Sequence, residues 1–422
     1  MKIVIMAGGK GTRISSVNSE VPKPMITVCG KPVLEHIIDS VKAQGYRDLI
    51  VVVGHLKNVI MDHFKDGAEF GVFIRYVEEE QPLGTAGALF FLRNELDEDF
   101  LLLNGDIIFD IDINRMHRYH KQKGGIATIL THPNNHPYDS GIIIADDENR
   151  VQDWLHKESP RVWYRNRVNA GIHMLSPRVF ELENGNLFQM DKRLDLDRDV
   201  LKPLISQREL YVYDSPEYVK DMGTPKRLLE VERDIQSGLV RQKNLENPQQ
   251  AVFLDRDGTI NRYVGFLRDI ESFELLPGVT EAIRVINASG YLAIVVTNQP
   301  LIARGEVTSE QLQMIHNKME TLLGVEGAYV DAIYYCPHHP HSGYEGEIAE
   351  LKIECECRKP KPGMLLNAAE EFHIDLQKSW MIGDSENDVL AGEAAGCRAI
   401  LLKSEEDLLN VVERILQDAE EG

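Results

Sequence analysis

Short apolar runs alternate with longer amphipathic stretches through the first half of the chain. The apolar runs predict buried strands at 3–6, 49–53, 73–77 and 100–104. Apolar residues recur at helical spacing over 33–44, directly after Pro32, and a second helix is expected to be capped by Thr85. Strands that alternate with helices are typical of a parallel sheet with helices on both faces. The first half therefore predicts an α/β domain.

The second half repeats this alternation with a different sequence. Its apolar runs predict strands at 251–254, 292–297, 332–335, 380–382 and 398–402. Before the first of them lies a polar segment with Ser-Gly, Asn-Pro and Gln-Gln pairs, which is typical of a linker. No internal repeat relates the two halves. The sequence therefore predicts two unlike Rossmann-like α/β domains, over 1–235 and 251–422, joined by a linker over 236–250.

Charge and composition argue against several kinds of partner. The chain has 422 residues with 46 basic and 67 acidic side chains, and its net charge of −21 repels the phosphate backbone of nucleic acids. Small phosphorylated ligands remain compatible, because lysine, arginine and Mg²⁺ can outweigh that field within one site. No apolar run approaches the roughly 18–20 residues of a membrane span, and the N-terminal run is too short for a signal peptide. We expect a cytoplasmic protein that binds small molecules, with no nucleic acid and no membrane as partner; a homo-oligomer is left open.

A glycine-rich segment follows the first predicted strand. Residues 7–13 read Ala-Gly-Gly-Lys-Gly-Thr-Arg, so backbone N–H groups can approach a phosphate chain while Lys10 and Arg13 supply positive charge. The spacing matches neither the dinucleotide fingerprint nor the P-loop. A plain glycine turn is the alternative, but the two cations favour a phosphate cradle.

Three further segments add polar chemistry to this domain. Lys23 stands between two prolines, which restrict the backbone and could aim its side chain at a second phosphate. The loop at 81–87 offers a side-chain amide and a backbone that a ligand can approach closely. Asp106 follows the strand at 100–104, at the sheet edge where ligands bind in parallel sheets. An aspartate there is commonly a turn residue, but the neighbouring cradle makes it a candidate metal ligand.

These motifs resemble, in order, the sugar-1-phosphate nucleotidyltransferases over nearly all of 1–230. The resemblance rests on segments 8–13, 22–25, 82–86, 105–106, 169–171 and 221–225. It implies a set of residues that bind the nucleoside triphosphate, namely Ala7, Gly8, Gly9, Gly11, Thr12 and Arg13 at the phosphates and Gln81, Gly84 and Thr85 at the base and ribose. It also implies that Lys23 and Arg13 act in catalysis, and that Asp106 and Asp221 hold Mg²⁺.

The same resemblance implies a sugar-phosphate site. Its residues are Gly141, Lys157, Asn169 and Gly171. The family usually has Glu-Lys where this chain has His156-Lys157, so the resemblance assigns no sugar-hydroxyl contact to His156. The reaction implied is attack by a sugar 1-phosphate oxygen on the α-phosphorus of the nucleotide, with pyrophosphate leaving, and it needs no protein nucleophile.

Paired carboxylates follow the first strand of the second half. Asp255 and Asp257 stand two residues apart just beyond a buried strand, where one carboxylate can act as nucleophile while the other transfers protons. An ordinary acidic turn without a catalytic role often has the same residue pattern. Three other segments distinguish this one: Thr297-Asn298 after a second strand, Lys359 among prolines, and an acidic run at 383–388 after a third strand.

These four elements resemble the haloacid dehalogenase superfamily of phosphatases over 251–402. The resemblance implies that Asp255 is the nucleophile, that Asp257 is the general acid and base, and that Thr297 and Lys359 hold the phosphoryl group. Mg²⁺ would be bound at Asp255, Asp257 and Asp384, with Asp388 supporting them. Asn298 and Arg358 are candidate substrate-binding residues.

Three cysteines of the second half lie within 22 residues of one another. Together with a nearby histidine they form Cys-x-His and Cys-x-Cys pairs, at Cys336, His338, Cys355 and Cys357. Four soft ligands at this spacing fit a tetrahedral structural Zn²⁺, with buried free thiols as the alternative. The loop resembles that of the D-glycero-D-manno-heptose 1,7-bisphosphate 7-phosphatases, and histidinol-phosphate phosphatases share much of it. Relatives usually read Ser-Gly at 300–301, where this chain has Pro-Leu.

The two resemblances imply consecutive reactions on one sugar. Removing the 7-phosphate leaves a heptose 1-phosphate, which a guanylyltransferase of the first family would activate, as in the synthesis of nucleotide-activated heptose for bacterial surface glycans such as lipopolysaccharide. GTP is implied by resemblance alone. One alternative is a hexose-1-phosphate nucleotidyltransferase fused to a phosphatase of other specificity, such as a histidinol-phosphate phosphatase. Another is a non-catalytic sensor, against which the intact carboxylates at 106, 221, 255, 257 and 384 argue.

Overall fold

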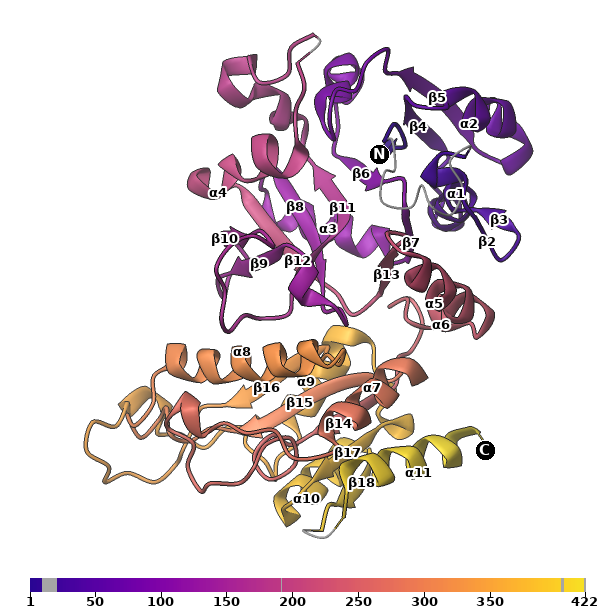
Figure 1. The fold of residues 1–422 in the computed structure, drawn as a ribbon. Helices are drawn as coiled ribbons and strands as arrows, with labels where there is room; N and C mark the ends of the chain where they lie inside the picture. The colour runs from indigo at the N-terminus through magenta and orange to yellow at the C-terminus, as the bar shows by residue number, and fades with distance from the viewer. Residues whose placement is uncertain (10–20, 191, 404–405, 421–422) are drawn as a thin grey trace. The chain divides into compact units, whose positions relative to one another are not determined.

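The structure is a computed structural model that describes residues 1–9, 21–190, 192–403 and 406–420 (Figure 1). It forms two compact units. The first comprises Met1–His132, Ile143–Trp154 and Asn169–Asn244, and the second Pro133–Ile142, Leu155–Val168 and Leu245–Gly422. Within the described residues, no helix combines the length and the apolar character needed to cross a membrane. The domain boundaries at 235 and 251 stay a prediction, and part of the predicted linker is helical, at α6 (Leu239–Gln242).

The first unit is built on a nine-stranded sheet with the order β10-β9-β11-β6-β1-β4-β5, to which β8 and β12 add. The four strands predicted there are present and mutually parallel, namely β1 (Ile3–Met6), β4 (Asp48–Val53), β5 (Phe73–Glu78) and β6 (Phe100–Asn104). The remaining strands are β8 (Ala127–His132), β9 (Ile142–Ala145), β10 (Val151–Leu155), β11 (Val168–Leu175) and β12 (Leu210–Asp214). Because β11 runs antiparallel to β6, the sheet is mixed rather than parallel throughout.

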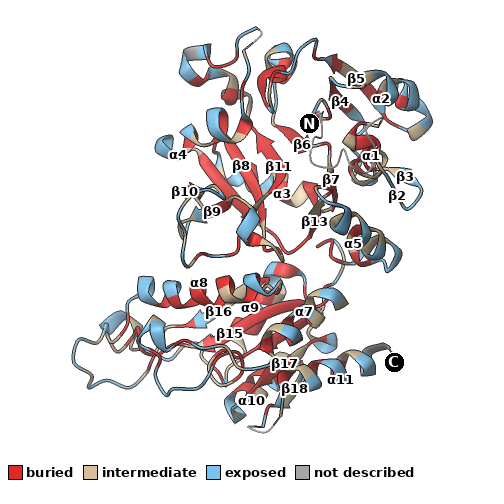
Figure 2. Ribbon diagram, viewed as in Figure 1, coloured by how far each residue is buried: buried red, intermediate tan, exposed pale blue. Residues whose placement is uncertain are grey.

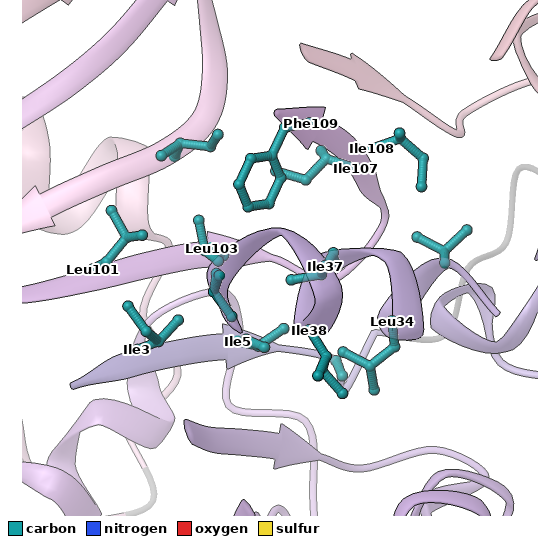
Figure 3. Packing of buried hydrophobic residues seen from close by; sticks show 14 of the residues in the cluster. Ile3, Ile5, Leu34, Ile37, Ile38, Leu101, Leu103, Ile107, Ile108 and Phe109 are labelled. Atoms are coloured by element: carbon teal, nitrogen blue, oxygen red, sulfur yellow. The ribbon is translucent and has the colours of Figure 1, made fainter. Parts of the chain in front are cut away.

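Helices cover this sheet, and short strands lie beside it. The helices are α1 (Val33–Ala43), α2 (Lys57–Phe64), α3 (Ile113–Lys123), α4 (Pro203–Gln207) and α5 (Pro225–Gln236). The short strands are β2 (Thr27–Val28), β3 (Lys31–Pro32), β7 (Ile107–Asp110) and β13 (Tyr218–Asp221). The apolar stripe of α1 packs on β1 and β6, as Figure 3 shows for Leu34, Ile37 and Ile38, all buried. This packing confirms the helix predicted over 33–44.

The helix predicted after Thr85 is wrong in type. The segment is a 3₁₀ helix over Gly87–Leu92. A Cβ placed on Gly87 would lie 2.6 Å from the backbone oxygen of Lys192, so glycine is required there for the two segments to approach. Glycine also disfavours an α-helix by about 1 kcal/mol relative to alanine.

The second unit contains a five-stranded parallel sheet with the order β16-β15-β14-β17-β18. Its strands are β14 (Ala251–Leu254), β15 (Leu292–Asn298), β16 (Ala332–Cys336), β17 (Trp380–Gly383) and β18 (Arg398–Leu401). Its helices are α7 (Val279–Ser289), α8 (Ser309–Val325), α9 (Gly363–Phe372), α10 (Glu386–Ala395) and α11 (Leu408–Glu420). This topology and that of the first unit confirm two unlike α/β domains.

Side chains of the central strand β14 alternate between two apolar cores. Val252 and Leu254 pack in the core that includes α7, α8 and α11, whereas Ala251 and Phe253 pack in the core that includes α9. Figure 2 shows the central strands of this sheet mostly in red, the colour of buried residues. Burial on both faces explains why these strands are continuous apolar runs in the sequence. It also leaves only the carboxyl ends of the strands free to present polar groups.

Candidate active sites

Three neighbouring parallel strands of the second unit end in the residues predicted to act on phosphate. Asp255 follows β14, Thr297 is the penultimate residue of β15, and Asp384 follows β17. Because β15 and β17 flank β14 in parallel register, these three residues share one edge of the sheet. The structure therefore brings together residues that lie up to 129 positions apart in the sequence.

A buried lysine joins this edge from the loop before α9. The Nζ atom of Lys359 lies 2.6 Å from Oδ1 of Asp255, 2.5 Å from Oδ1 of Asp388 and 2.8 Å from the backbone oxygen of Val296. Lys359 is only 4% exposed, so a cation there depends on the two carboxylates. The arrangement places fixed positive charge beside Asp255, where a phosphoryl group would need it.

Burial controls the protonation of these groups. It raises the pKa of Asp255 to about 6, although the neighbouring Lys359 opposes the shift. Burial alone would lower the pKa of Lys359, but Asp255 and Asp388 raise it overall. Burial and the nearby Asp388 also raise the pKa of Asp384. Each carboxylate therefore depends on cations to stay ionised.

Three carboxylates of this site are grouped closely enough to share a cation. Oxygen atoms of Asp255, Asp384 and Asp388 all lie within 4.8 Å of one another. Gly258 has a φ of +97°, and a Cβ there would collide with the carboxylate of Asp384, so the loop needs glycine to pass this close. Hard oxygen donors in this number suit Mg²⁺, which would keep the carboxylates ionised and screen an incoming phosphate.

Asp257 lies outside that group of three, and its carboxylate has other partners. It accepts hydrogen bonds from Arg256 at 2.7 and 2.9 Å, from Asn261 at 3.1 Å and from Gln299 at 2.9 Å. Arg256 is fully buried and also contacts His316. These donors fix the carboxyl group in one orientation, as a general acid requires. The metal-binding role of Asp257 stays a prediction.

These donors to Asp257 were not predicted from the sequence. Arg256 stands between the two predicted catalytic aspartates, and Gln299 directly follows Thr297-Asn298. Their closeness in sequence to predicted site residues is the feature that could have indicated them. Gln299 also donates to Oγ1 of the buried Thr297, at 2.9 Å. One glutamine amide therefore links Asp257, the predicted general acid, to the predicted phosphoryl-binding threonine.

Asn298 holds the loop that carries Lys359. Its Oδ1 accepts from the backbone N–H of Lys359 at 3.0 Å, and its Nδ2 donates to the carbonyl of Lys359 at 3.0 Å. Arg358 donates to the carbonyl of His338 at 3.2 Å. Both contacts position the lysine loop, and the substrate-binding roles of Asn298 and Arg358 stay predictions.

The four residues predicted to bind zinc come together beside this loop. The sulfur atoms of Cys336, Cys355 and Cys357 are 3.3 to 3.5 Å apart, and Nδ1 of His338 lies 3.3 Å from the Cys357 sulfur. These separations approach the edge of a tetrahedron with Zn–S bonds of ~2.3 Å, which is roughly 3.8 Å. All four ligand atoms lie within 4.8 Å of one another. The donor set fits structural Zn²⁺, because four protein ligands leave no position for water or substrate.

Zinc at this cluster has a measurable consequence. We expect elemental analysis to find about one zinc per chain, and Cys355→Ser to lower both the zinc content and, roughly 10- to 100-fold, the phosphatase kcat/KM, because Lys359 follows the cluster directly. Cys29→Ser, at an exposed cysteine outside the cluster, should change neither. Protein prepared without chelator and free of zinc would contradict the assignment.

In the first unit, the glycine segment begins where β1 ends. The backbone N–H of Ala7 donates to Val52 at 2.8 Å, which extends the pairing with β4 by one residue. Gly8 lies against the buried carboxylate of Glu79, a residue that the sequence analysis missed. Gly11, Thr12 and Arg13 lie outside the described residues, and their predicted contacts with the triphosphate stay predictions.

The predicted metal ligands of the first unit lie at the end of one strand pair, where Asp106 directly precedes β7 and Asp221 ends β13. In the antiparallel pair β7–β13, Asp221 is opposite Ile107, and the backbone N–H of Met222 donates to the carbonyl of Asp106 at 2.9 Å. The Nζ atom of Lys23 lies 3.1 Å from Oδ2 of Asp106. Three predicted residues of this site therefore occupy one region, and its two carboxylates offer the hard donors that Mg²⁺ prefers.

An arginine that the sequence analysis missed holds Asp221. The Nη1 atom of Arg227 lies 2.8 Å from both carboxylate oxygens of Asp221, and the backbone N–H of Gly223 donates to Oδ1 at 2.7 Å. These contacts fix the orientation of the carboxylate before any cation binds. The signal in the sequence was only that Arg227 lies six residues after Asp221.

The loop at 81–87, which is predicted to face the base, is hydrogen-bonded to a segment at 194–196. Gly84 has a φ of +84° and pairs with Leu194, and Oγ1 of Thr85 accepts from the backbone N–H of Leu196 at 2.7 Å. The side chain of Gln81 is exposed. The roles of Gln81, Gly84 and Thr85 in nucleotide binding stay predictions.

The predicted sugar-phosphate residues fall into two groups. In the first unit, Oδ1 of Asn169 accepts from Gly171 at 3.0 Å and contacts His173 at 3.1 Å, while its Nδ2 lies 3.4 Å from Asp197. Burial raises the pKa of Asp197 to about 7. Gly141 and the exposed Lys157 lie in segments of the second unit. Their joint role stays a prediction.

Comparison with known proteins gives two family matches. A family model described as nucleotidyl transferase matches residues 2–238, and one described as HAD-hydrolase-like matches residues 356–414. Mannose-1-phosphate guanyltransferase 2 of Candida glabrata is 32% identical over 235 residues, which cover 54% of this chain and 63% of the relative. The beta-A enzyme of Xenopus laevis is 29% identical with the same coverage. The chain thus spans less than two thirds of these curated relatives.

Solved structures resemble each half. HddC from Yersinia pseudotuberculosis, complexed with GMP-PN, is 23% identical, and the match covers 56% of this chain and 99% of HddC with a TM-score of 0.47. The D,D-heptose 1,7-bisphosphate phosphatase of B. bronchiseptica, with magnesium and phosphate, is 32% identical over 40% of this chain and 99% of that chain, with a TM-score of 0.36. With its family match over more than half of its length and the HAD-like match beyond it, the chain belongs to the nucleotidyl transferase family and carries a second, HAD-like domain.

Proposed function

We propose that this chain is a bifunctional enzyme of nucleotide-activated heptose synthesis. The HAD-like domain removes the 7-phosphate of D-glycero-D-manno-heptose 1,7-bisphosphate, and the nucleotidyltransferase domain transfers GMP from GTP to the resulting heptose 1-phosphate. The observation that carries the proposal is the contact of Lys359 with Asp255, at 2.6 Å, in the loop that directly follows the Cys₃His cluster. That loop is the feature that resembles the heptose-bisphosphate 7-phosphatases.

The phosphatase reaction follows from the roles available at the sheet edge. A carboxylate oxygen of Asp255 attacks the phosphorus, an aspartyl-phosphate forms, and the bond to the sugar oxygen breaks while Asp257 donates a proton to it. Asp257 then takes a proton from water, which attacks the phosphorus, releases inorganic phosphate and restores Asp255. Lys359 neutralises the phosphoryl charge during both steps. A Mg²⁺ held by Asp255 and Asp384 would add charge neutralisation to this site.

The transferase reaction needs positioning rather than a protein nucleophile. An oxygen of the sugar 1-phosphate attacks the α-phosphorus of GTP, and pyrophosphate leaves. Lys23 contributes positive charge next to Asp106, and Asp106 and Asp221 would hold a Mg²⁺ that neutralises the reacting phosphates. Neutralisation matters because both reactants are anions.

Two considerations support a manno-configured sugar and GTP. The curated relatives of the first domain are named mannose-1-phosphate guanyltransferases. The heptose has the ring configuration of mannose with one more carbon. An enzyme that transfers GMP to mannose 1-phosphate is therefore a close chemical precedent for one that transfers GMP to heptose 1-phosphate. The order of reactions follows, because a phosphatase that removed the 1-phosphate would destroy the nucleophile of the transferase.

Arg358 provides a test of the bisphosphate substrate. A guanidinium beside Lys359 can grip the distal 1-phosphate as a planar fork, and losing such a contact costs about 2–3 kcal/mol. We expect Arg358→Ala to lower kcat/KM for the heptose bisphosphate roughly 30- to 150-fold, and to change that for p-nitrophenyl phosphate much less. Lys361→Ala removes a nearby half-exposed cation and serves as the control.

The product of the wild type is identified in the same experiment. Phosphorus NMR should show loss of the 7-phosphate signal and retention of the 1-phosphate. Two results would contradict the proposed substrate. One is an equal loss of kcat/KM in Arg358→Ala for the heptose bisphosphate and for p-nitrophenyl phosphate, and the other is a wild-type product that keeps its 7-phosphate.

A second candidate is a mannose-1-phosphate guanylyltransferase fused to a phosphatase of other specificity. The names of the curated relatives favour it directly. Transferase kcat/KM with heptose 1-phosphate and with mannose 1-phosphate distinguishes the two, because the proposal requires the heptose to be the better acceptor.

A further inference from the structure

Three loops of the second unit extend from the phosphatase site. They are the segments at 262–268, 300–306 and 339–352. The first begins after Asn261 and the second after Gln299, and both of these side chains donate to the carboxylate of Asp257. The third begins after His338, a residue of the Cys₃His cluster. Each loop therefore starts from a residue that is held at the catalytic group or at the cluster.

Arg304, in the second loop, contacts the other two loops. Its guanidinium carbon lies 4.5 Å from the centre of the Phe266 ring and 4.5 Å from the centre of the Tyr344 ring. Its Nη2 donates to Nε2 of the buried His339 at 3.1 Å. Because arginine has no acceptor, this nitrogen of His339 accepts, and the other, Nδ1, donates to the carbonyl of His341 at 3.0 Å. One cation therefore connects all three loops.

Two further contacts bring the same loops together. Gly305 has a φ of +72°, and a Cβ placed on it would lie 1.9 Å from the backbone oxygen of Gly346. Only glycine lets the second and third loops approach this closely. Between the first and second loops, Nε of Arg268 lies 2.7 Å from Oε2 of Glu306. The contacts of Arg304 therefore belong to a close association of the three loops.

The Pro-Leu pair at 300–301 adds apolar packing to the second loop. Leu301 is only 3% exposed and packs with three other buried apolar residues, Ile302, Val307 and Leu312. Leu351 of the third loop packs against this group. Glycine, which relatives usually have at 301, would lack the side chain that makes these contacts. The difference from the relatives therefore strengthens the association of the second and third loops.

We propose that Arg304 is a positioning residue that holds the three loops in the arrangement that binds a sugar phosphate, an inference that rests on the proposed phosphatase activity. A planar guanidinium can stack on a ring with each face while its edge still donates a hydrogen bond, which a lysine cannot do. A small phosphate ester needs little beyond Asp255, Asp257 and Lys359. A heptose phosphate is larger and extends past these residues. Arg304 should therefore affect binding of the sugar substrate and not the chemical step.

A direct contact with the second phosphate is the alternative role for Arg304. Its Nε is buried and, among the residues that the structure describes, has no hydrogen-bond partner, so a phosphate oxygen could accept from it. Heptose 7-phosphate, which lacks the 1-phosphate, separates the two roles. A change in the loops weakens binding of both heptose phosphates, whereas loss of a direct contact weakens binding of the bisphosphate alone.

The experiment uses the full chain with Mg²⁺ and compares heptose 1,7-bisphosphate, heptose 7-phosphate and p-nitrophenyl phosphate. In Arg304→Ala we expect KM for both heptose phosphates to rise roughly 10- to 100-fold, with kcat changed less than about threefold. The kcat/KM for p-nitrophenyl phosphate should change less than about threefold, and the zinc content should not change. Arg262→Ala, which removes an exposed arginine of the first loop, is the control and should keep all wild-type values.

A pair of substitutions at Tyr344 tests the stacking itself. Tyr344→Phe keeps the ring and should keep KM for both heptose phosphates within about twofold of the wild type. Tyr344→Leu removes the ring and should raise both KM values at least about fivefold. Equal KM values in the two variants would overturn the inference.

Three outcomes of the Arg304→Ala kinetics would also overturn it. A rise in KM confined to the bisphosphate would make Arg304 a ligand of the second phosphate. Equal losses of kcat/KM with all three substrates would indicate general damage to the site. Unchanged KM values for the heptose phosphates would show that the loops do not depend on Arg304.

Amide hydrogen exchange tests the loops without a substrate. Arg304→Ala should speed exchange in the segments at 262–268 and 339–352 at least about tenfold, because both lose contacts to the second loop. Unchanged exchange would overturn the inference whatever the substrate is. Faster exchange in a protein whose wild type hydrolyses neither heptose phosphate would contradict the proposed function and leave the role of Arg304 in the loops standing.

Discussion

Asp255→Asn is expected to lower phosphate release from heptose 1,7-bisphosphate at least about a thousandfold, because an amide cannot attack phosphorus. The change keeps the shape of the side chain, and Asp388 still lies 2.5 Å from the buried Lys359. The domain should therefore fold. Pyrophosphate release from GTP and added heptose 1-phosphate should stay at the wild-type rate, since Lys23, Asp106 and Asp221 belong to the first unit.

The matched control for this prediction is Glu370→Gln, an exposed carboxylate on α9 changed in the same way. Phosphate release and pyrophosphate release are measured on the same preparations, together with thermal unfolding. Residual phosphatase activity above about one hundredth of the wild-type rate in Asp255→Asn would show that another group is the nucleophile.

Asp106→Ala should have the reverse effect. It removes one predicted Mg²⁺ ligand and the carboxylate that lies 3.1 Å from Nζ of Lys23. We expect pyrophosphate release to fall roughly 10²- to 10⁴-fold, because charge neutralisation supplies most of the catalysis when two anions react. Phosphate release from the bisphosphate should be unchanged. Asp97→Ala, at an exposed position of the same domain, is the control.

Together these two variants test whether the active sites are separate. Loss of both activities in either variant, with thermal unfolding unchanged, would contradict the assignment of one reaction to each domain. If both variants kept both activities, neither Asp255 nor Asp106 would take part in catalysis.

Much of the phosphatase site was predictable because its geometry follows from the sheet. Continuous apolar runs fixed the strands, and parallel strands end at the same edge, so Asp255, Thr297 and Asp384 had to meet there. The grouping of Cys336, His338, Cys355 and Cys357 was predictable for a different reason. Soft ligands in two closely spaced pairs have few other uses at this spacing.

The remaining contacts depend on folding over long distances along the chain. Gln299 reaches Asp257 across 42 positions, and Leu196 reaches Thr85 across 111. Nothing in the local pattern distinguishes such a glutamine from a surface residue. Glu79 is a similar case, because three consecutive glutamates read alike in the sequence and only the fold buries the second one. The antiparallel strand β11 was not predicted, because Asn169, Gly171 and His173 interrupt its apolar residues and leave no continuous apolar run.

The proposed function requires the two domains to act in sequence on one sugar. Phosphorus NMR of the full chain with heptose 1,7-bisphosphate, GTP and Mg²⁺ tests this most directly. We expect inorganic phosphate from the 7-position to appear first, and pyrophosphate and a GDP-linked heptose then to accumulate together. Release of the 1-phosphate, or a heptose 1-phosphate that persists with GTP unconsumed, would contradict it.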